Sequence, residues 1–219
     1  MTKKRWIALI SALGVVIAAA VTTAAVANRG SSHAEDDSPL LVASSTTPPT
    51  VHRTTTTHAT TTTVDLAKLP HPDPPPPDPY APSPIIEIGA VEIPKISLLH
   101  SVFEGITLTV IDHGPGHWPG SALPCQLGNA VFPGHRVTHT HPFLDLDLLS
   151  PGDQVIFHMP GKKCIYKVTG TQIVKPTDLF VTDPTPTPTF TLIACNPKHS
   201  AAQRIVVKGS LVSVVRVKT

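Results

Sequence analysis

The chain has 219 residues and a formal net charge of +2 at pH 7, and only 5% of its residues are aromatic. This balance excludes the strongly basic surface that nucleic-acid binding requires, and so few aromatic side chains offer little for stacking on bases. Eleven of the 25 prolines lie between Pro48 and Pro84, so the length overstates the folded part. The residues from Ile85 onward suffice for one hydrophobic core.

An apolar run opens the chain. Residues 6–27 are uncharged and mostly apolar, and residues 3–5 before them are basic. A helix of this length spans roughly 33 Å, about the hydrocarbon core of a bilayer. A cleaved signal peptide is the alternative, since residues 25–27 resemble a cleavage site. The length favours a retained anchor, so residues 1–27 predict a single-pass plasma-membrane protein with its N-terminus inside and the rest on the cell-wall side.

Residues 28–84 have low complexity. A Thr-rich run covers residues 54–63 and a Pro-rich run covers residues 70–84. Such a segment buries too little apolar surface to offset the entropy of ordering it, so the sequence predicts a disordered Thr/Pro-rich linker. The Pro-rich half is expected to be a semi-rigid spacer, and the Thr-rich half is typical of O-glycosylated stalks.

Residues 85–219 read as an all-β domain. Many short β-branched and apolar runs alternate with turn residues, which is typical of a closed barrel or a sandwich. Short helices are expected at residues 108–112 and 143–149, and residues 114–120 are expected to form no regular element. Strands are expected at residues 90–93, 96–103, 129–132, 153–158, 164–169, 172–174, 190–194, 204–207 and 211–217, and Gly209 is expected to part the last two.

A thiol is placed at the end of one of these strands. Residues 190–194 predict a buried strand that Asn196-Pro197 ends, so Cys195 lies where a rigid scaffold can aim it. The alternative is that Cys195 is a small buried hydrophobic residue. His135 also follows a predicted strand, and a histidine activates a thiol by stabilising the thiolate. Arg204 opens the next strand and is a candidate to stabilise an oxyanion.

The histidines and the cysteines allow two further interpretations. His135, His139 and His141 form a cluster that suits a zinc site, but their loop reads as solvated, so no metal and no cofactor are expected. The cysteines Cys125, Cys164 and Cys195 allow one disulfide plus a free thiol, or three free thiols.

Several motifs together resemble one known family. Residues 191–197 with Arg204 resemble the TLxTC…R signature of sortases, and residues 134–136 and 142–153 are similar to the corresponding run of the class E sortases of actinobacteria. Residues 93–96 and 114–120 fit the same class. The resemblance covers about residues 88–212.

This resemblance implies an eight-stranded sortase-type β-barrel in which Cys195 is the nucleophile, His135 its acid/base partner and Arg204 the substrate and oxyanion stabiliser. It implies a membrane-anchored cysteine transpeptidase that cleaves an LPxTG-like or LAxTG-like sorting signal between Thr and Gly. The partners would be secreted proteins that carry this signal and the amine of a lipid II-like peptidoglycan precursor. Residues 175–189 would form the loop that walls the sorting-signal groove.

Two departures from the family pattern leave alternatives open. Ala194 stands where the family usually has Thr, which removes a hydroxyl beside the thiol. An inactive wall-binding or adhesive barrel therefore remains an alternative, as does a hydrolytic cysteine peptidase on the same barrel. Cys125 stands where class E sequences usually have Gly, so a disulfide with Cys164 is conceivable.

Overall fold

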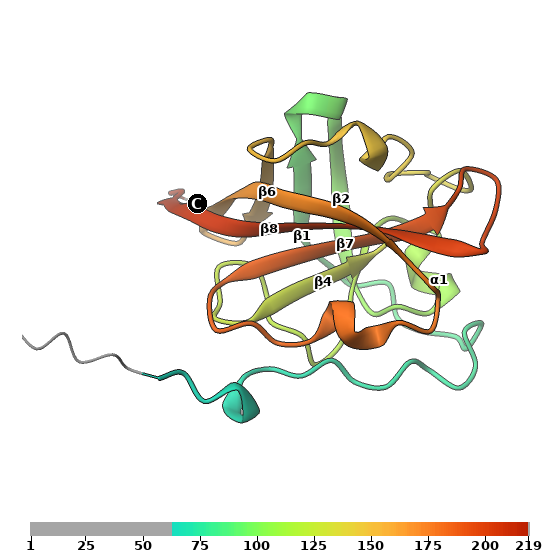
Figure 1. Cartoon of the computed structure of the whole chain (residues 1–219), viewed down its shortest axis with the longest axis horizontal. Helices are drawn as coiled ribbons and strands as arrows, with labels where there is room; N and C mark the ends of the chain where they lie inside the picture. Colours follow the sequence, from blue (N-terminus) through green and yellow to red (C-terminus); the bar gives the residue numbers. More distant parts are fainter. Residues whose placement is uncertain (1–62, 219) are drawn as a thin grey trace, which may run out of the picture. The chain divides into compact units, whose positions relative to one another are not determined.

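The computed structural model describes residues 63–218, and eight strands of this part form one continuous sheet (Figure 1). The strand order is β3-β2-β1-β5-β6-β8-β7-β4. Neighbours are antiparallel except for β2 with β3 and β4 with β7, which are parallel. The strands are β1 (Glu87–Ile93), β2 (Leu98–Glu104), β3 (Gly116–His117), β4 (Asn129–Pro133), β5 (Gln154–Met159), β6 (Lys162–Val174), β7 (Thr189–Asn196) and β8 (Gln203–Arg216).

The two ends of this sheet meet. The backbone N–H of Trp118, just after β3, donates to the carbonyl of Val131 in β4 at 2.8 Å. The N–H of Ala122 donates to the carbonyl of Asn129 at 3.1 Å. The edge strands therefore close on each other, which removes exposed sheet edges. This nearly closed barrel confirms the predicted all-β eight-stranded architecture.

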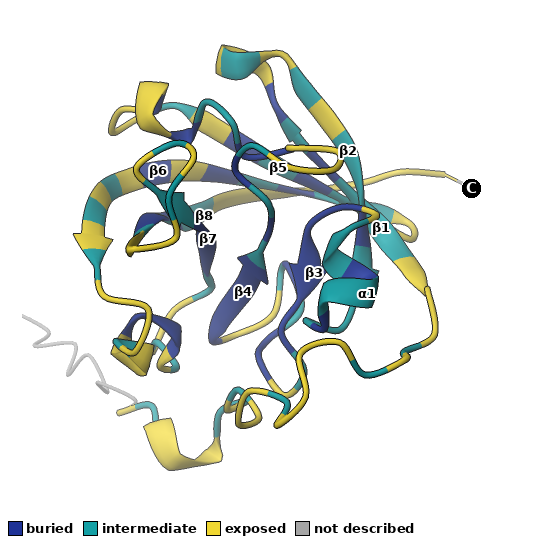
Figure 2. Cartoon of the chain, turned by 90° about the vertical axis from the view of Figure 1, so that its right-hand side faces the viewer, coloured by how far each residue is buried: buried dark blue, intermediate teal, exposed yellow. Residues whose placement is uncertain are grey.

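Aromatic side chains fill the barrel interior. The ring centroids of Phe132 and Phe157 lie 4.8 Å apart, and those of Tyr166 and Phe190 lie 5.5 Å apart in an edge-to-face arrangement. All four side chains are fully buried, and β4 and β7, which carry Phe132 and Phe190, appear mostly dark blue in Figure 2. Successive residues of a strand face opposite sides of the sheet, so the neighbours of each of these residues along its strand point out of the barrel.

Two strands are longer than the sequence predicts. Residues 164–169 and 172–174 form a single strand, β6, with a register shift between Val168 and Gly170. Residues 204–207 and 211–217 likewise belong largely to one strand, β8, which passes through Gly209. Gly209 lies opposite Phe190, and a Cβ atom there would overlap the Phe190 ring. This glycine therefore makes room for a core aromatic ring and does not end the strand.

The helices are short. The expected turn at residues 108–112 is confirmed as α1 (Leu108–Ile111). The helix expected over residues 143–149 is only a 3₁₀ turn, and residues 114–120 contain the two-residue strand β3 despite their turn-rich composition. The 3₁₀ helices are η1 (Leu66–Lys68), η2 (Pro94–Ile96), η3 (Leu146–Leu148) and η4 (Leu179–Thr182).

The end of the Pro-rich segment lies on the barrel. We call residues 63–84 the strap; Figure 1 shows it running along one side of the domain. The Asp73 N–H donates to the carbonyl of Pro119 at 2.8 Å, and the Trp118 indole N–H donates to the carbonyl of Asp73 at 2.8 Å. The Leu108 N–H donates to the carbonyl of Pro79 at 2.7 Å. The predicted disorder therefore does not hold for residues 63–84, because the barrel supplies partners for their backbone groups.

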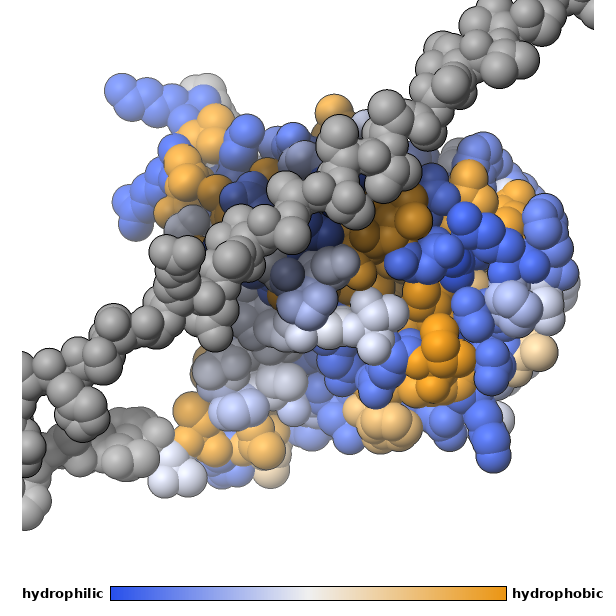
Figure 3. Space-filling view, turned by 45° about the horizontal axis from the view of Figure 1, so that its top comes forward, coloured by the Kyte–Doolittle hydropathy of each residue, from blue (hydrophilic) through white to orange (hydrophobic). Residues whose placement is uncertain are grey.

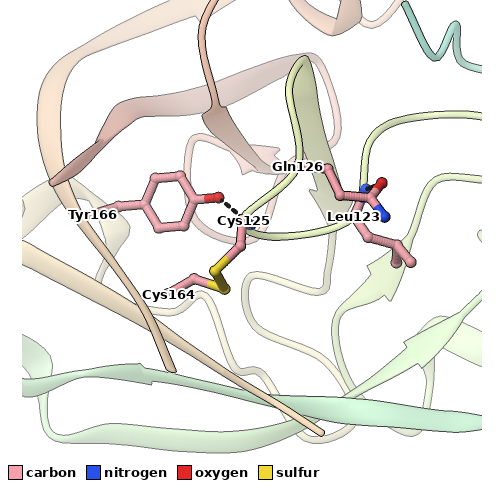
Figure 4. Close-up of a disulfide and its surroundings, with 5 residues drawn as sticks. All are labelled: Leu123, Cys125, Gln126, Cys164 and Tyr166. Carbon is pink, nitrogen blue, oxygen red and sulfur yellow. Dashed lines mark hydrogen bonds between the residues drawn. A yellow bond between two sulfur atoms is a disulfide. The ribbon is translucent and has the colours of Figure 1, made fainter. Parts of the chain in front are cut away.

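A disulfide joins Cys125, in the loop before β4, to Cys164 in β6 (Figure 4). Beside it, the Cys125 N–H donates to the Tyr166 hydroxyl at 2.8 Å. Of the two arrangements that the sequence left open, the structure has the one with a single disulfide. Cys195 is the cysteine that remains free.

The predicted membrane anchor and the Thr-rich part of the predicted linker lie outside the described residues. Within residues 63–218, none of the helices combines the length and the apolar character needed to cross a bilayer. On the face drawn in Figure 3, hydrophobic side chains form small separate patches between hydrophilic ones.

Candidate active site

Two parallel strands bring His135 and Cys195 to one end of the barrel. In the parallel pair of β4 and β7, Pro133 lies beside Ile193, and the Gly134 N–H donates to the carbonyl of Ile193 at 2.9 Å. Parallel strands end at the same edge of a sheet, so the residues that follow β4 lie near the end of β7. His135 and Cys195 accordingly line the same cavity, whose volume is about 330 Å³.

Cys195 is half-buried and faces away from the core. Strand residues alternate, so Ala194 and Cys195 point to opposite sides of β7. Ala194 is 2% exposed and belongs to the barrel core, whereas Cys195 lines the outer cavity. The missing hydroxyl at Ala194 therefore lies on the core side of the strand, away from the thiol.

His135 is held by a carboxylate. The distance between His135 Nε2 and Asp112 Oδ1 is 2.7 Å, and the histidine side chain is only 14% exposed. A carboxylate only accepts hydrogen bonds, so Nε2 carries the proton and donates a hydrogen bond to Asp112. In the neutral ring, Nδ1 is then left with a free lone pair. Asp112, which ends α1, fixes both the orientation and the tautomer of His135.

Arg204 is the direct cross-strand partner of Cys195 in the antiparallel ladder of β7 and β8. Residues directly opposite in such a ladder project from the same face of the sheet. The Arg204 Nη1 group donates to the carbonyls of Ala201 and Gln203, each at 2.9 Å. The guanidinium is thus turned toward its own loop, and within residues 63–218 its Nε and Nη2 groups have no hydrogen-bond partner.

A second arginine, Arg136, lies beneath the site and is only 2% exposed. It donates from Nε to the carbonyl of Leu144 at 2.8 Å and from Nη1 to the carbonyl of Cys195 at 3.3 Å. Its Nη2 lies 2.8 Å from the carboxylate of Asp147. Arg136 therefore ties the end of β7 to the η3 segment and fixes the backbone of the free cysteine.

A groove lined mostly by apolar side chains lies on the same outer face. Its cavity of about 290 Å³ is bordered by Arg204 and by Ile193, two residues before Cys195 on β7. Residues of the loop at 175–189 form one wall of this cavity. Strap residues also border this cavity, namely Pro75, Pro76 and Pro79. The strap therefore forms part of the wall of this groove.

The sequence reasoning grouped His135 and His139 correctly but not His141. The rings of His135 and His139 have centroids 4.7 Å apart, and His139 Nδ1 lies 3.3 Å from Asp112 Oδ1. His141 borders a different cavity. Asp112 and Arg136 were not among the predicted site residues. Arg136 at least adjoins His135 in sequence, but nothing marked Asp112, which reaches the site only through the fold.

Comparisons with known proteins identify the family of this domain. A model of the sortase domain family matches residues 91–212. Sortase SrtE1 of Streptomyces coelicolor is 30% identical over 138 residues, which cover 56% of this chain and 39% of that protein. This chain therefore matches about two fifths of that relative's length.

Solved structures show the same fold. Sortase E1 from Streptomyces coelicolor, crystallised with a tripeptide in its active site, superposes with a TM-score of 0.57 at 26% identity, covering 60% of this chain and 91% of that one. Sortase E from Streptomyces avermitilis gives a TM-score of 0.56 at 30% identity with the same coverage.

Proposed function

Because this chain belongs to the sortase family, we propose that it is a membrane-anchored cysteine transpeptidase of the class E type. It would cleave an LPxTG-like or LAxTG-like sorting signal between Thr and Gly and join the acyl group to an amine of a cell-wall precursor. The observation that carries this proposal is the shared cavity of His135 and Cys195, with Arg204 directly opposite Cys195 in the ladder.

The first half-reaction uses the thiol and the imidazole. The Cys195 thiolate attacks the carbonyl carbon of the Thr–Gly bond and forms a tetrahedral oxyanion. The intermediate collapses when the C–N bond breaks, and protonated His135 gives its proton to the leaving glycine amine. The products are a thioester on Cys195, a free amine and a neutral His135.

The second half-reaction reverses this order with another amine. Neutral His135 takes a proton from the incoming amine as it attacks the thioester carbonyl. The new peptide bond forms, the C–S bond breaks and the thiolate is restored. The Asp112 carboxylate stabilises the imidazolium that is present before acylation and formed again by the second half-reaction, because it accepts the Nε2 hydrogen bond throughout.

Arg204 has donors to spare for the reacting carbonyl or for the sorting peptide. Because Arg204 lies opposite Cys195, a turn of its guanidinium toward the thiol would bring a permanent positive charge to the developing oxyanion. The groove bordered by Ile193 and Arg204 would hold the apolar part of the sorting signal. A peptide bound there would lie against the strap.

Product analysis tests the proposal against hydrolysis. The full-length chain is incubated with LPxTG and LAxTG peptides, with and without a short oligoglycine amine, and the products are identified by mass. A transpeptidase gives the ligated product when the amine is present, whereas a cysteine peptidase gives only the free acid. The Cys195→Ala variant, which removes the thiol, should give neither product.

An inactive wall-binding barrel would give no product with any peptide and no thioester adduct. Ala194 gives this alternative little support, because its side chain packs in the core and not beside the thiol.

For the cellular location, protease added to intact cells should degrade the barrel if residues 6–27 anchor it outside the membrane. Protection of the barrel in intact cells would contradict that location.

A further inference from the structure

Three metal-ligand side chains converge beside the thiol cavity, from three different segments. Asp112 ends α1, His135 follows β4, and His139 lies in the loop after it, with a backbone φ of 52°. One ligand atom from each side chain lies within 4.8 Å of the others. The same carboxylate oxygen of Asp112 is 2.7 Å from His135 Nε2 and 3.3 Å from His139 Nδ1.

Two of the three separations come close to those of a tetrahedral metal site, and the third, between His135 and His139, is at most 4.8 Å. With metal–ligand distances of about 2.0–2.2 Å, two ligand atoms in such a site lie roughly 3.3–3.6 Å apart. The His139–Asp112 distance already has this value, and the His135–Asp112 distance needs to lengthen by less than about 1 Å. A metal ion would replace the protons that now join these groups.

The donor set selects the kind of ion. Two imidazole nitrogens and one carboxylate oxygen suit Zn²⁺ and related transition metals, whereas Ca²⁺ and Mg²⁺ prefer oxygen ligands alone. The His139 side chain is 49% exposed, so an ion can enter from solvent and a water can complete the coordination. The site therefore has the composition of an open three-ligand centre.

We propose that Asp112, His135 and His139 form a reversible binding site for Zn²⁺ or a similar divalent ion, which inhibits the enzyme when it is filled. The inhibitory half of this inference rests on the proposed function, because it needs His135 as the acid/base group. A metal on Nε2 leaves room for one proton on the ring, at Nδ1. The ring then cannot form the imidazolium that stabilises the thiolate and protonates the leaving amine.

Binding is tested first, without any activity measurement. The protein is the untagged full-length chain carrying Cys195→Ala, so that the thiol cannot act as a ligand. Titration with Zn²⁺ by calorimetry, and with Co²⁺ by visible absorption, should show one tight site per chain with the spectrum of a tetrahedral centre. Adding His139→Ala should weaken this site by at least about tenfold, since one of three protein ligands is lost.

The matched control is His141→Ala, which removes a histidine two residues away that borders a different cavity. It should bind the metal as the parent does. Equal binding in the parent and the His139→Ala protein would overturn the site, and so would equal weakening by His141→Ala. Absence of binding in the parent, while a protein with Cys195 intact binds, would assign the metal to the thiol. Thermal unfolding of each variant shows whether a loss of binding reflects a loss of fold.

Inhibition is then tested by the ratio of transpeptidation rates with and without Zn²⁺, measured within each variant. The Zn²⁺ concentration for half inhibition should rise at least about tenfold in His139→Ala and stay unchanged in His141→Ala. Binding without inhibition would overturn the inhibitory half alone. Absence of any transpeptidation without metal would refute the proposed function and leave the binding result standing.

Discussion

Asp112 accepts a hydrogen bond from His135 at 2.7 Å across 23 residues of sequence. In the proposed reaction, His135 becomes positively charged in each cycle, and a fixed carboxylate stabilises that charge and holds the ring. Asp112 is thus a positioning residue that acts through His135.

Asp112→Asn should lower kcat/KM for transpeptidation by at least about tenfold, because an amide of the same shape carries no charge to stabilise the imidazolium. The pH–rate profile should also move, since the protonated ring has lost its partner. A lower rate with an unmoved profile would indicate a merely structural role. Circular dichroism should show an unchanged fold.

Loosening the strap should improve peptide binding. Pro75 and Pro76 border the groove. Replacing both with Gly gives the detached strap more conformations, so ordering it against the groove costs more entropy. If strap and peptide compete, KM should fall by about fourfold or more with kcat little changed. The matched control replaces Pro82 and Pro84 with Gly. Both are exposed strap residues that do not border this groove. An equal effect of both pairs would contradict competition at the groove.

The buried Arg136 should matter far more to stability than the exposed ion pair near it. Arg136→Ala leaves the carbonyls of Leu144 and Cys195 without this donor and Asp147 without its buried partner, so it should cost about 2–4 kcal/mol of unfolding free energy. Lys198 lies 3.7 Å from the same carboxylate but is partly exposed, so Lys198→Ala should cost less than about 1 kcal/mol. Urea unfolding of both variants measures the difference, and similar costs would contradict it.

The stability of the barrel should fall in alkali through Tyr166. Burial raises the pKa of its hydroxyl to about 12, and the hydrogen bond from Cys125 lowers it in part. The unfolded chain loses this proton near pH 10, so the contribution is complete below pH 10 and is lost as pH rises toward 12. The loss amounts to at most about 2.7 kcal/mol.

Tyr166→Phe provides the comparison. This variant lacks the hydroxyl that accepts from Cys125, so it should be less stable at neutral pH by about 1–3 kcal/mol. The difference from wild type should shrink between pH 10 and pH 12. Burial also lowers the pKa of Lys208, which makes stability rise as pH approaches 10.5, but this effect is common to both proteins. Parallel curves of unfolding free energy against pH would contradict the assignment to Tyr166.

The sequence predicted the strands and the cysteine at the end of one of them because these depend on local patterns. The end of β7 at Asn196 shows this, since the Pro after it stops the ladder. Gly209 was misjudged as a break because its role depends on Phe190, a residue of another strand. The strap was misjudged because composition reports what a segment can bury alone, not the partners that Trp118 and Leu108 supply.

The residues of the site also divide into those that local sequence patterns indicate and those that only distant contacts bring in. Cys195 and His135 were identified because each follows its own strand, and the parallel pairing of β4 with β7 brings them together. Asp112 and Arg136 depend on contacts across 23 and 59 residues of sequence, respectively. Local patterns carry no information about such contacts.

The disulfide has a consequence for the chemistry of the third cysteine. Thiolates attack accessible disulfides, so a nucleophile and a cross-link in one small domain are liable to scramble. Here Cys164 has no exposed surface and lies within the barrel core, whereas Cys195 opens onto the outer face of β7. The barrel wall therefore separates the buried Cys164 sulfur from the Cys195 thiol, which lets one small folded domain hold a disulfide and a free thiol together.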